Sequence, residues 1–113
     1  MKRITPEMAL RAYEETGLKP MQGDYFPEKG CACGLGVMMQ HIHPEINIEA
    51  LDIHKFDVRV SATFGNSYKS GFAAGFDGVP EEFRGFMGTI EKAAYEDGRK
   101  VWEAVKHLAG VET

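Results

Sequence analysis

The chain has 113 residues, of which 43% are hydrophobic and 27% charged, and its formal net charge is −4 at pH 7. This composition is typical of one globular domain and excludes a disordered chain, so we predict a single domain over residues 1–113. The excess of acidic residues argues against binding to nucleic acid or to an anionic membrane surface, because both need a basic face. No apolar run is long enough to span a membrane.

The N-terminus and the cysteines predict a location in the cytoplasm. Lys2 and Arg3 are followed by no apolar stretch, which does not fit a secretory signal peptide. The chain has two cysteines, Cys31 and Cys33, and a secreted disulfide scaffold has more cysteines at wider spacing. We therefore expect both thiols to be reduced.

The first two predicted elements are a helix and a β-hairpin. Thr5 is a good N-cap, Pro6 suits the first helical position, and Gly17 suits a helix end, which predicts a helix over 6–16. Residues 18–30 contain two prolines and two glycines and have no helical period. The segment 27–30 is typical of a turn, so a short hairpin is predicted around 20–33.

A second helix is predicted over 32–42. Apolar residues recur there at helical spacing, namely Cys31, Leu35, Met38 and Ile42. Gly34 and Gly36 weaken this helix by about 1 kcal/mol each relative to alanine. Pro44 disfavours helical geometry at the preceding residue and ends the element.

Residues 56–64 fit two interpretations. Apolar residues alternate strictly from Phe56 to Phe64, as in a half-buried strand, yet Ile53, Phe56, Val60 and Phe64 also share one helical face. We favour a helix, because the following segment is helical and the junction at Gly65 is short.

Two further helices are predicted over 66–76 and 89–108. Tyr68, Phe72 and Phe76 are spaced four residues apart and form one aromatic stripe, with Gly71 and Gly75 on an adjacent strip. The last helix carries the strip Tyr95, Gly98 and Trp102. A Tyr-x-x-Gly pattern in both segments predicts that glycines let these two helices pack closely. The fold class is thus mostly α (α+β), a bundle of four to five helices with an early hairpin.

The most specific chemical pattern is Cys31-x-Cys33 followed by His41-x-His43. Two thiolates and two imidazoles are a complete tetrahedral set for Zn²⁺. A one-residue gap counts against this site, since neighbours so spaced lie about 200° apart on a helix. The simpler interpretation, which we favour, is two small buried thiols and two surface histidines.

A second alternative is a reactive thiol. If Cys31 or Cys33 lies at a helix N-terminus, the helix dipole lowers the thiol pKa, and a nearby histidine completes a nucleophile and base pair. The four candidate bases are His41, His43, His54 and His107.

The aromatic residues Tyr68, Phe72, Phe76 and Trp102 are either core or an interface. Such a stripe is most often core, and that is the interpretation we favour. Together with six methionines it would also suit a protein interface, for which a homodimer is the commonest form.

The sequence contains no recognisable catalytic set, which favours a non-enzymatic, cytoplasmic interaction module with no cofactor. The alternative is a zinc-binding or thiol-active protein built on Cys31, Cys33, His41 and His43. A DNA-binding helix-turn-helix over 56–76 is the least favoured, because Lys69 is the one basic residue of its second helix.

Overall fold

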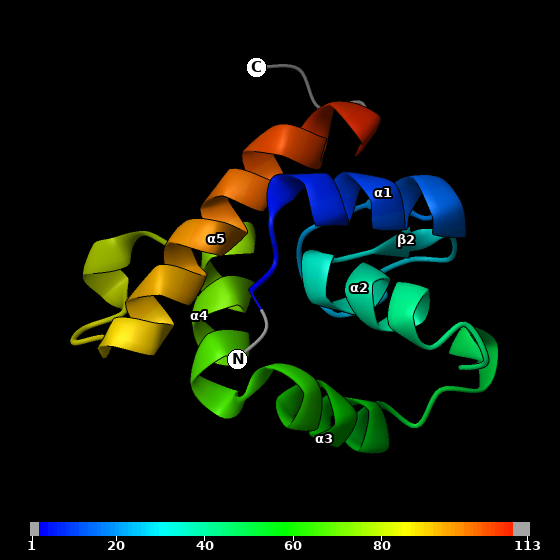
Figure 1. Cartoon of the computed structure of the whole chain (residues 1–113), viewed down its shortest axis with the longest axis horizontal. Coiled ribbons are helices and arrows are strands. Elements are labelled where there is room, and N and C mark those ends of the chain that lie inside the picture. The colour runs from blue at the N-terminus through cyan, green and yellow to red at the C-terminus, as the bar shows by residue number, and fades with distance from the viewer. Residues whose placement is uncertain (1–2, 110–113) are drawn as a thin grey trace.

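The computed structural model describes residues 3–109, and this part of the chain contains five α-helices and two short strands (Figure 1). In chain order the elements are α1 (Pro6–Thr16), β1 (Lys19–Pro20), β2 (Cys31–Ala32), α2 (Gly34–Ile42), α3 (Ile53–Phe64), α4 (Asn66–Phe76) and α5 (Thr89–Val105). Three short 3₁₀ helices accompany them, at Ile48–Ala50, Glu81–Phe83 and Lys106–Ala109. The predicted mostly-α class is confirmed.

Helix α1 has the predicted bounds and caps. The Thr5 side chain accepts a hydrogen bond from the backbone N–H of Met8, and Gly17 adopts the left-handed conformation with φ of 75°. This left-handed conformation at the end of a helix strongly favours glycine, because glycine has no Cβ. Local chemistry therefore defines both ends of this helix.

The predicted β-hairpin is wrong, because β1 and β2 pair in parallel. Lys19 pairs with Cys31 and Pro20 with Ala32. The ten residues between the strands therefore carry the chain back to the start of β1, and β2 then runs in the same direction as β1. The reason is tertiary: the Gln22 side-chain amide donates to the Phe76 carbonyl, and the Gly23 N–H donates to the Asp77 carboxylate. These contacts hold the loop against the end of α4, which a local hairpin would not reach.

The ambiguous segment 56–64 is helical, as favoured, and belongs to α3. The Asp52 carboxylate caps this helix by accepting from the backbone N–H groups of His54 and Lys55. Gly65, with φ of 91°, is the single residue between α3 and α4. Helix α2 begins two residues later than predicted, and α5 gives way to a 3₁₀ turn at Lys106.

Helices α4 and α5 pack closely, as the paired glycine patterns predict (Figure 1). A Cβ at Gly75 would lie 2.0 Å from the Tyr95 carbonyl oxygen, and a Cβ at Gly98 would lie 2.2 Å from the Phe72 carbonyl oxygen. A Cβ at Gly71 would similarly lie 2.1 Å from the Glu91 carbonyl oxygen. Only glycine permits such close approach of the two backbones.

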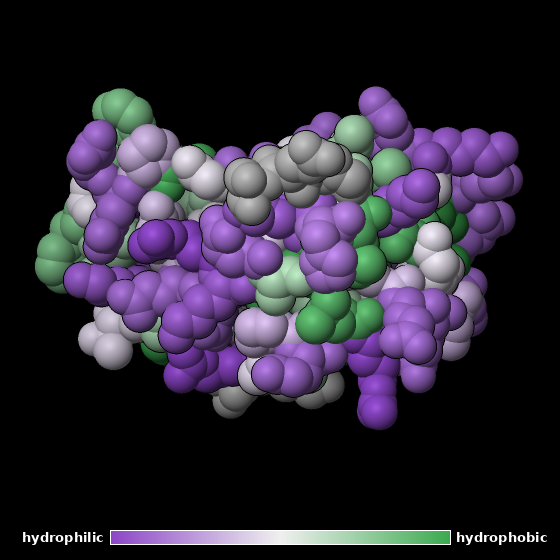
Figure 2. Space-filling model, turned by 90° about the horizontal axis from the view of Figure 1, so that it is seen from above, coloured by the Kyte–Doolittle hydropathy of each residue, from purple (hydrophilic) through white to green (hydrophobic). Residues whose placement is uncertain are grey.

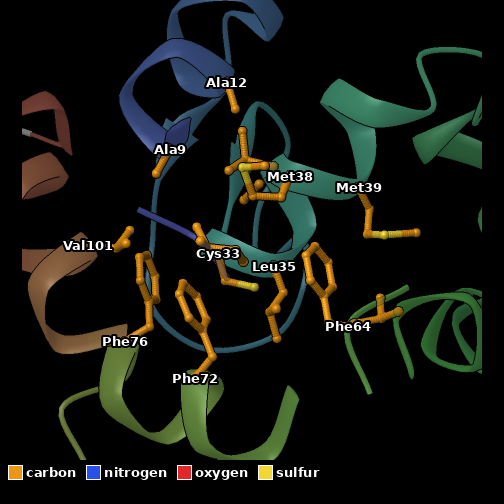
Figure 3. Close-up of a cluster of buried hydrophobic side chains, with 14 of the residues drawn as sticks. Ala9, Ala12, Cys33, Leu35, Met38, Met39, Phe64, Phe72, Phe76 and Val101 are labelled. Atoms are coloured by element: carbon orange, nitrogen blue, oxygen red, sulfur yellow. The ribbon is translucent and has the colours of Figure 1, made fainter. Parts of the chain in front are cut away.

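The hydrophobic core lies where all five α-helices meet (Figure 3). Phe72 and Phe76 point from α4 towards α2, and Val101 reaches them from α5. Leu35, Met38 and Met39 contribute from α2, and Ala9 and Ala12 let α1 approach closely. None of the helices within residues 3–109 is long and apolar enough to cross a membrane.

Candidate functional site

Helix α2 separates the four predicted zinc ligands. Cys31 and Cys33 precede its first residue, whereas His41 and His43 lie at its last turn and C-cap. Nine helical residues span about 13 Å, which is too far for one metal ion to be shared. Across residues 3–109 no group of three or more His, Cys, Asp or Glu residues could hold a metal ion, so the structure gives the zinc alternative no support.

The two histidines instead face carboxylates. His41 Nδ1 lies 3.2 Å from Glu15 Oε2, and His43 Nδ1 lies 3.4 Å from Glu45 Oε2. All four side chains are at least partly exposed, so these contacts belong to the solvated surface. Such pairs contribute little to the free energy of unfolding.

The aromatic stripe faces the interior. Tyr68, Phe72 and Phe76 are at most 1% exposed, and their rings stack along α4 with centroids 6.0 and 6.2 Å apart. Trp102 is partly buried and packs edge-on against Phe76, with centroids 5.2 Å apart. The structure places these four side chains where the core interpretation expects them. The exposed aromatic side chains are Phe83 and Phe86, in the connection between α4 and α5.

Cys33 is the N-cap of α2, as the reactive-thiol alternative requires. Its Sγ accepts a hydrogen bond from the backbone N–H of Gly36 at 3.4 Å, and it lies among Leu35 and Phe72 (Figure 3). Burial nevertheless raises the pKa of the Cys33 thiol to about 12, because desolvation outweighs the hydrogen bonds from the helix N-terminus. The thiol is therefore protonated at neutral pH.

Cys33 also lies on the wall of an open cavity of about 540 Å³ that is lined by four separate parts of the chain. The loop before β2, the start of α2, the first turns of α3 and the middle of α4 meet there. The lining residues are Gly23, Asp24, Tyr25, Cys33, Leu35, Ile53, His54, Asp57, Lys69, Ser70 and Ala73. A larger hollow runs along α5 and is lined mainly by exposed charged side chains of that one helix, so we take the cavity where the four segments meet as the candidate site.

Tyr25 is held in the cavity wall by its backbone and its ring. Its carbonyl oxygen accepts from the Cys33 N–H at 3.0 Å, which ties the loop to the start of α2. A Cβ at Gly36 would lie 2.3 Å from that same oxygen, so glycine is needed for this approach. The Tyr25 ring packs edge-on against Phe56 of α3, with centroids 5.0 Å apart.

Asp57 joins three elements at the cavity. Its carboxylate accepts a hydrogen bond from the Tyr25 hydroxyl, and the Lys69 ammonium lies 3.1 Å from Oδ1 and 3.2 Å from Oδ2. The Asp52 cap sets the start of α3 and hence the direction in which Asp57 projects. Loop, α3 and α4 thus meet at one carboxylate.

The same contacts keep Asp57 ionised. The hydrogen bonds from Tyr25 and then Lys69 lower the pKa of the Asp57 carboxyl below its usual value. Burial, followed by the bond to Asp57, raises the pKa of the Tyr25 hydroxyl. At neutral pH the site therefore combines a carboxylate, an ammonium and a neutral phenol.

The sequence analysis missed Tyr25, Asp57 and Lys69 as a group. They are separated by 32 and 12 residues along the chain, so no spacing motif connects them. His54 lines the same cavity as Cys33, whereas His41 and His43 do not. The one available signal was that Lys69 is a lone cation on an apolar helix.

Comparison of the chain with protein-family models, curated proteins and solved structures finds no significant match.

Proposed function

We propose that this protein is a non-enzymatic binding module that takes a small ligand into the cavity between the 21–30 loop, α2, α3 and α4. The main support for this proposal is that the cavity combines apolar walls with one hydrogen-bonded charge cluster, which consists of Tyr25, Asp57 and Lys69. Ligand pockets are usually of roughly 300–1,000 Å³ and have this character: apolar surface supplies affinity and a few polar groups supply orientation.

The state of the Cys33 thiol supports binding over covalent chemistry. A protonated thiol is a poor nucleophile. The Cys33 Sγ also already accepts a hydrogen bond from the Gly36 N–H in the first turn of its own helix. We place the protein in the cytoplasm, since both cysteines are free thiols.

Filling the cavity tests this proposal. Ala73 lines it from α4, so Ala73→Phe should occupy the space and abolish binding of small aromatic probes. Ala62→Phe adds the same ring to an exposed position on α3 and is the matched control. Binding is measured by ¹H–¹⁵N chemical-shift mapping, with thermal unfolding to verify that both variants fold. Equal binding by both variants would place the ligand elsewhere and refute the proposal.

Self-association is a second proposed property, with a second copy of the chain as the partner. Its support is the pair Phe83 and Phe86, which are 77% and 96% exposed. Hydrophobic surface is visible at the end of the molecule where the connection between α4 and α5 lies (Figure 2). Contiguous exposed apolar surface commonly marks an interface. Sedimentation equilibrium of the Phe86→Ser variant tests this self-association, with Val58→Ser as the control because Val58 is also an exposed hydrophobic residue. A dimer that is lost only in Phe86→Ser supports this surface as the interface. A monomeric wild-type protein refutes self-association.

A further inference from the structure

We propose that the ligand of this cavity is a small cationic amine with an apolar body, whose ammonium group binds Asp57. This inference rests on the proposed binding function and specifies the ligand class. It follows from three features of the site: the ammonium already on Asp57, the unequal freedom of Asp57 and Lys69, and the arrangement of apolar walls behind them.

Asp57 already binds an ammonium group. Lys69 Nζ contacts both carboxylate oxygens, at 3.1 and 3.2 Å, while the Tyr25 hydroxyl donates to Oδ1. Tyr25 is itself fixed by its backbone contact with Cys33 and its ring contact with Phe56. The carboxylate is therefore oriented by a rigid donor, and the geometry of an ammonium complex is already present.

The two charged partners differ in how easily each can leave. The Lys69 ammonium is at the end of a flexible four-carbon chain and can move into water, where it is well hydrated. Asp57 has a shorter side chain, and the Tyr25 hydroxyl donates a hydrogen bond that holds its carboxylate in place. Either kind of ion must separate Lys69 from Asp57. A cation then pairs with the carboxylate that stays in the cavity wall, whereas an anion would leave that carboxylate without a cationic partner beside it.

The local charge balance also favours a cation. The charged side chains lining the cavity include two carboxylates, Asp24 and Asp57, against the single ammonium of Lys69. Asp77 adds a further carboxyl nearby, since it accepts from the Gly23 N–H. An anionic ligand would meet this excess of negative charge at short range.

The walls define the rest of the ligand. Leu35 and Cys33, which are 1% and 6% exposed, and Ala73 of α4 supply apolar lining. The Asp57 side chain is 45% exposed and lies at the mouth. The proposed ligand therefore places an apolar body of about the size of a phenyl ring against these walls and its ammonium group at Asp57.

Three probes of similar shape and different charge test the inference: 2-phenylethylamine, 2-phenylethanol and 3-phenylpropionate. Each is titrated into wild-type protein, and dissociation constants are obtained from ¹H–¹⁵N shifts of residues lining the cavity. We expect the amine to bind about tenfold more tightly than the alcohol, and the carboxylate to bind weakest.

Variants at the charge cluster give opposite expected results. Lys69→Met removes the competing ammonium and should tighten amine binding several-fold, and Lys69→Gln repeats the test with a polar residue. Asp57→Asn should weaken amine binding about tenfold and leave the alcohol unchanged. Glu14→Gln, which removes an exposed carboxylate on α1, is the control for net charge and should change nothing.

The outcomes separate this inference from the proposed function. Tighter binding of the carboxylate or the alcohol than of the amine, or weaker amine binding by both Lys69 variants, would overturn the amine assignment and retain a binding cavity. If none of the three probes shifts the cavity residues at millimolar concentration, the binding function itself fails along with it.

Discussion

At the scale of single residues, Cys33 is subject to two opposing effects. The N-terminus of α2 favours the thiolate through the Gly36 N–H, whereas desolvation favours the neutral thiol. Burial is the larger effect and raises the pKa of Cys33 to about 12. A helix N-terminus therefore activates a thiol only where water or a cation also reaches it.

This balance predicts slow alkylation of Cys33. Its thiolate fraction at pH 7.5 should be roughly a thousandfold below that of an ordinary thiol, since the pKa is about three units higher. Iodoacetamide labelling of Cys31→Ser, which retains Cys33, should be far slower than labelling of Cys33→Ser, which retains the half-exposed Cys31. Labelling in denaturant should equalise the two rates. Fast labelling of native Cys33 would restore the reactive-thiol alternative.

Tyr68 occupies a buried polar network within the aromatic stripe. Its hydroxyl accepts from the Ile4 N–H at 2.7 Å and donates to Asp97 Oδ2 at 2.7 Å. Arg3 completes the network with two hydrogen bonds to the Asp97 carboxylate. One hydroxyl thus connects the N-terminal segment to α5.

We expect Tyr68→Phe to reduce the free energy of unfolding by about 1–3 kcal/mol, because the Ile4 N–H and an Asp97 oxygen each lose a buried partner. Urea denaturation measures this loss. Tyr25→Phe removes a hydroxyl at the partly exposed cavity and should cost less. A loss at Tyr68 no greater than that at Tyr25 would mean that water replaces the hydroxyl.

At the scale of elements, the pairing of α4 with α5 depends on glycines. Each glycine face of one helix receives a backbone carbonyl of the other, so the two helices approach at backbone distance. Aromatic rings flank this contact and fill the space beside it. The helical hairpin is consequently held together by direct backbone contact between its two helices.

Gly75→Ala should therefore destabilise the protein by about 1–3 kcal/mol or more, since the added methyl would lie 2.0 Å from the Tyr95 carbonyl oxygen and the helices must separate. Gly88→Ser is the control: no heavy atom lies within 4 Å of its Cβ position, and serine can cap α5. Chemical denaturation should show a loss for the first variant and a slight gain for the second. Equal stability of both variants would show that this interface repacks freely.

At the scale of the whole molecule, buried thiol and phenol groups with raised pKa values make the free energy of unfolding decrease at alkaline pH. Burial raises the pKa values of Cys33, Tyr13 and Tyr68 above those of the unfolded chain. Above about pH 9 the unfolded thiol is ionised while the folded thiol keeps its proton. The folded state then binds more protons, so stability falls as pH rises.

For Cys33 alone this fall is about 1.4 kcal/mol per pH unit between roughly pH 9 and pH 12. Urea unfolding at pH 8, 9, 10 and 11 should show a steeper decline in wild-type protein than in Cys33→Ala, with the tyrosines acting in both. Cys31→Ala, which leaves the buried thiol in place, should follow the wild type. Parallel curves for wild type and Cys33→Ala would contradict the assigned burial effect.

Much of the fold was predictable because its causes are local. Thr5, Pro6 and Gly17 define α1 by capping and backbone geometry alone. The four-residue spacing of Tyr68, Phe72 and Phe76 predicts their shared face, and the matched glycines predict close helix packing. The caps and the aromatic spacing involve residues within a few turns of one another, where spacing determines which side chains are neighbours. The glycine prediction needed only the same short pattern in two helices.

Only the tertiary structure decided the strand pairing, the state of Cys33 and the cavity. The direction of β2 depends on contacts between the loop and the end of α4, more than 50 residues away. The sequence around Cys33 places this residue at the N-terminus of α2, but its burial comes from elements that are distant in the chain. The charge cluster forms because the loop, α3 and α4 pack together and bring Tyr25, Asp57 and Lys69 into contact. No spacing pattern in the sequence connects these three residues.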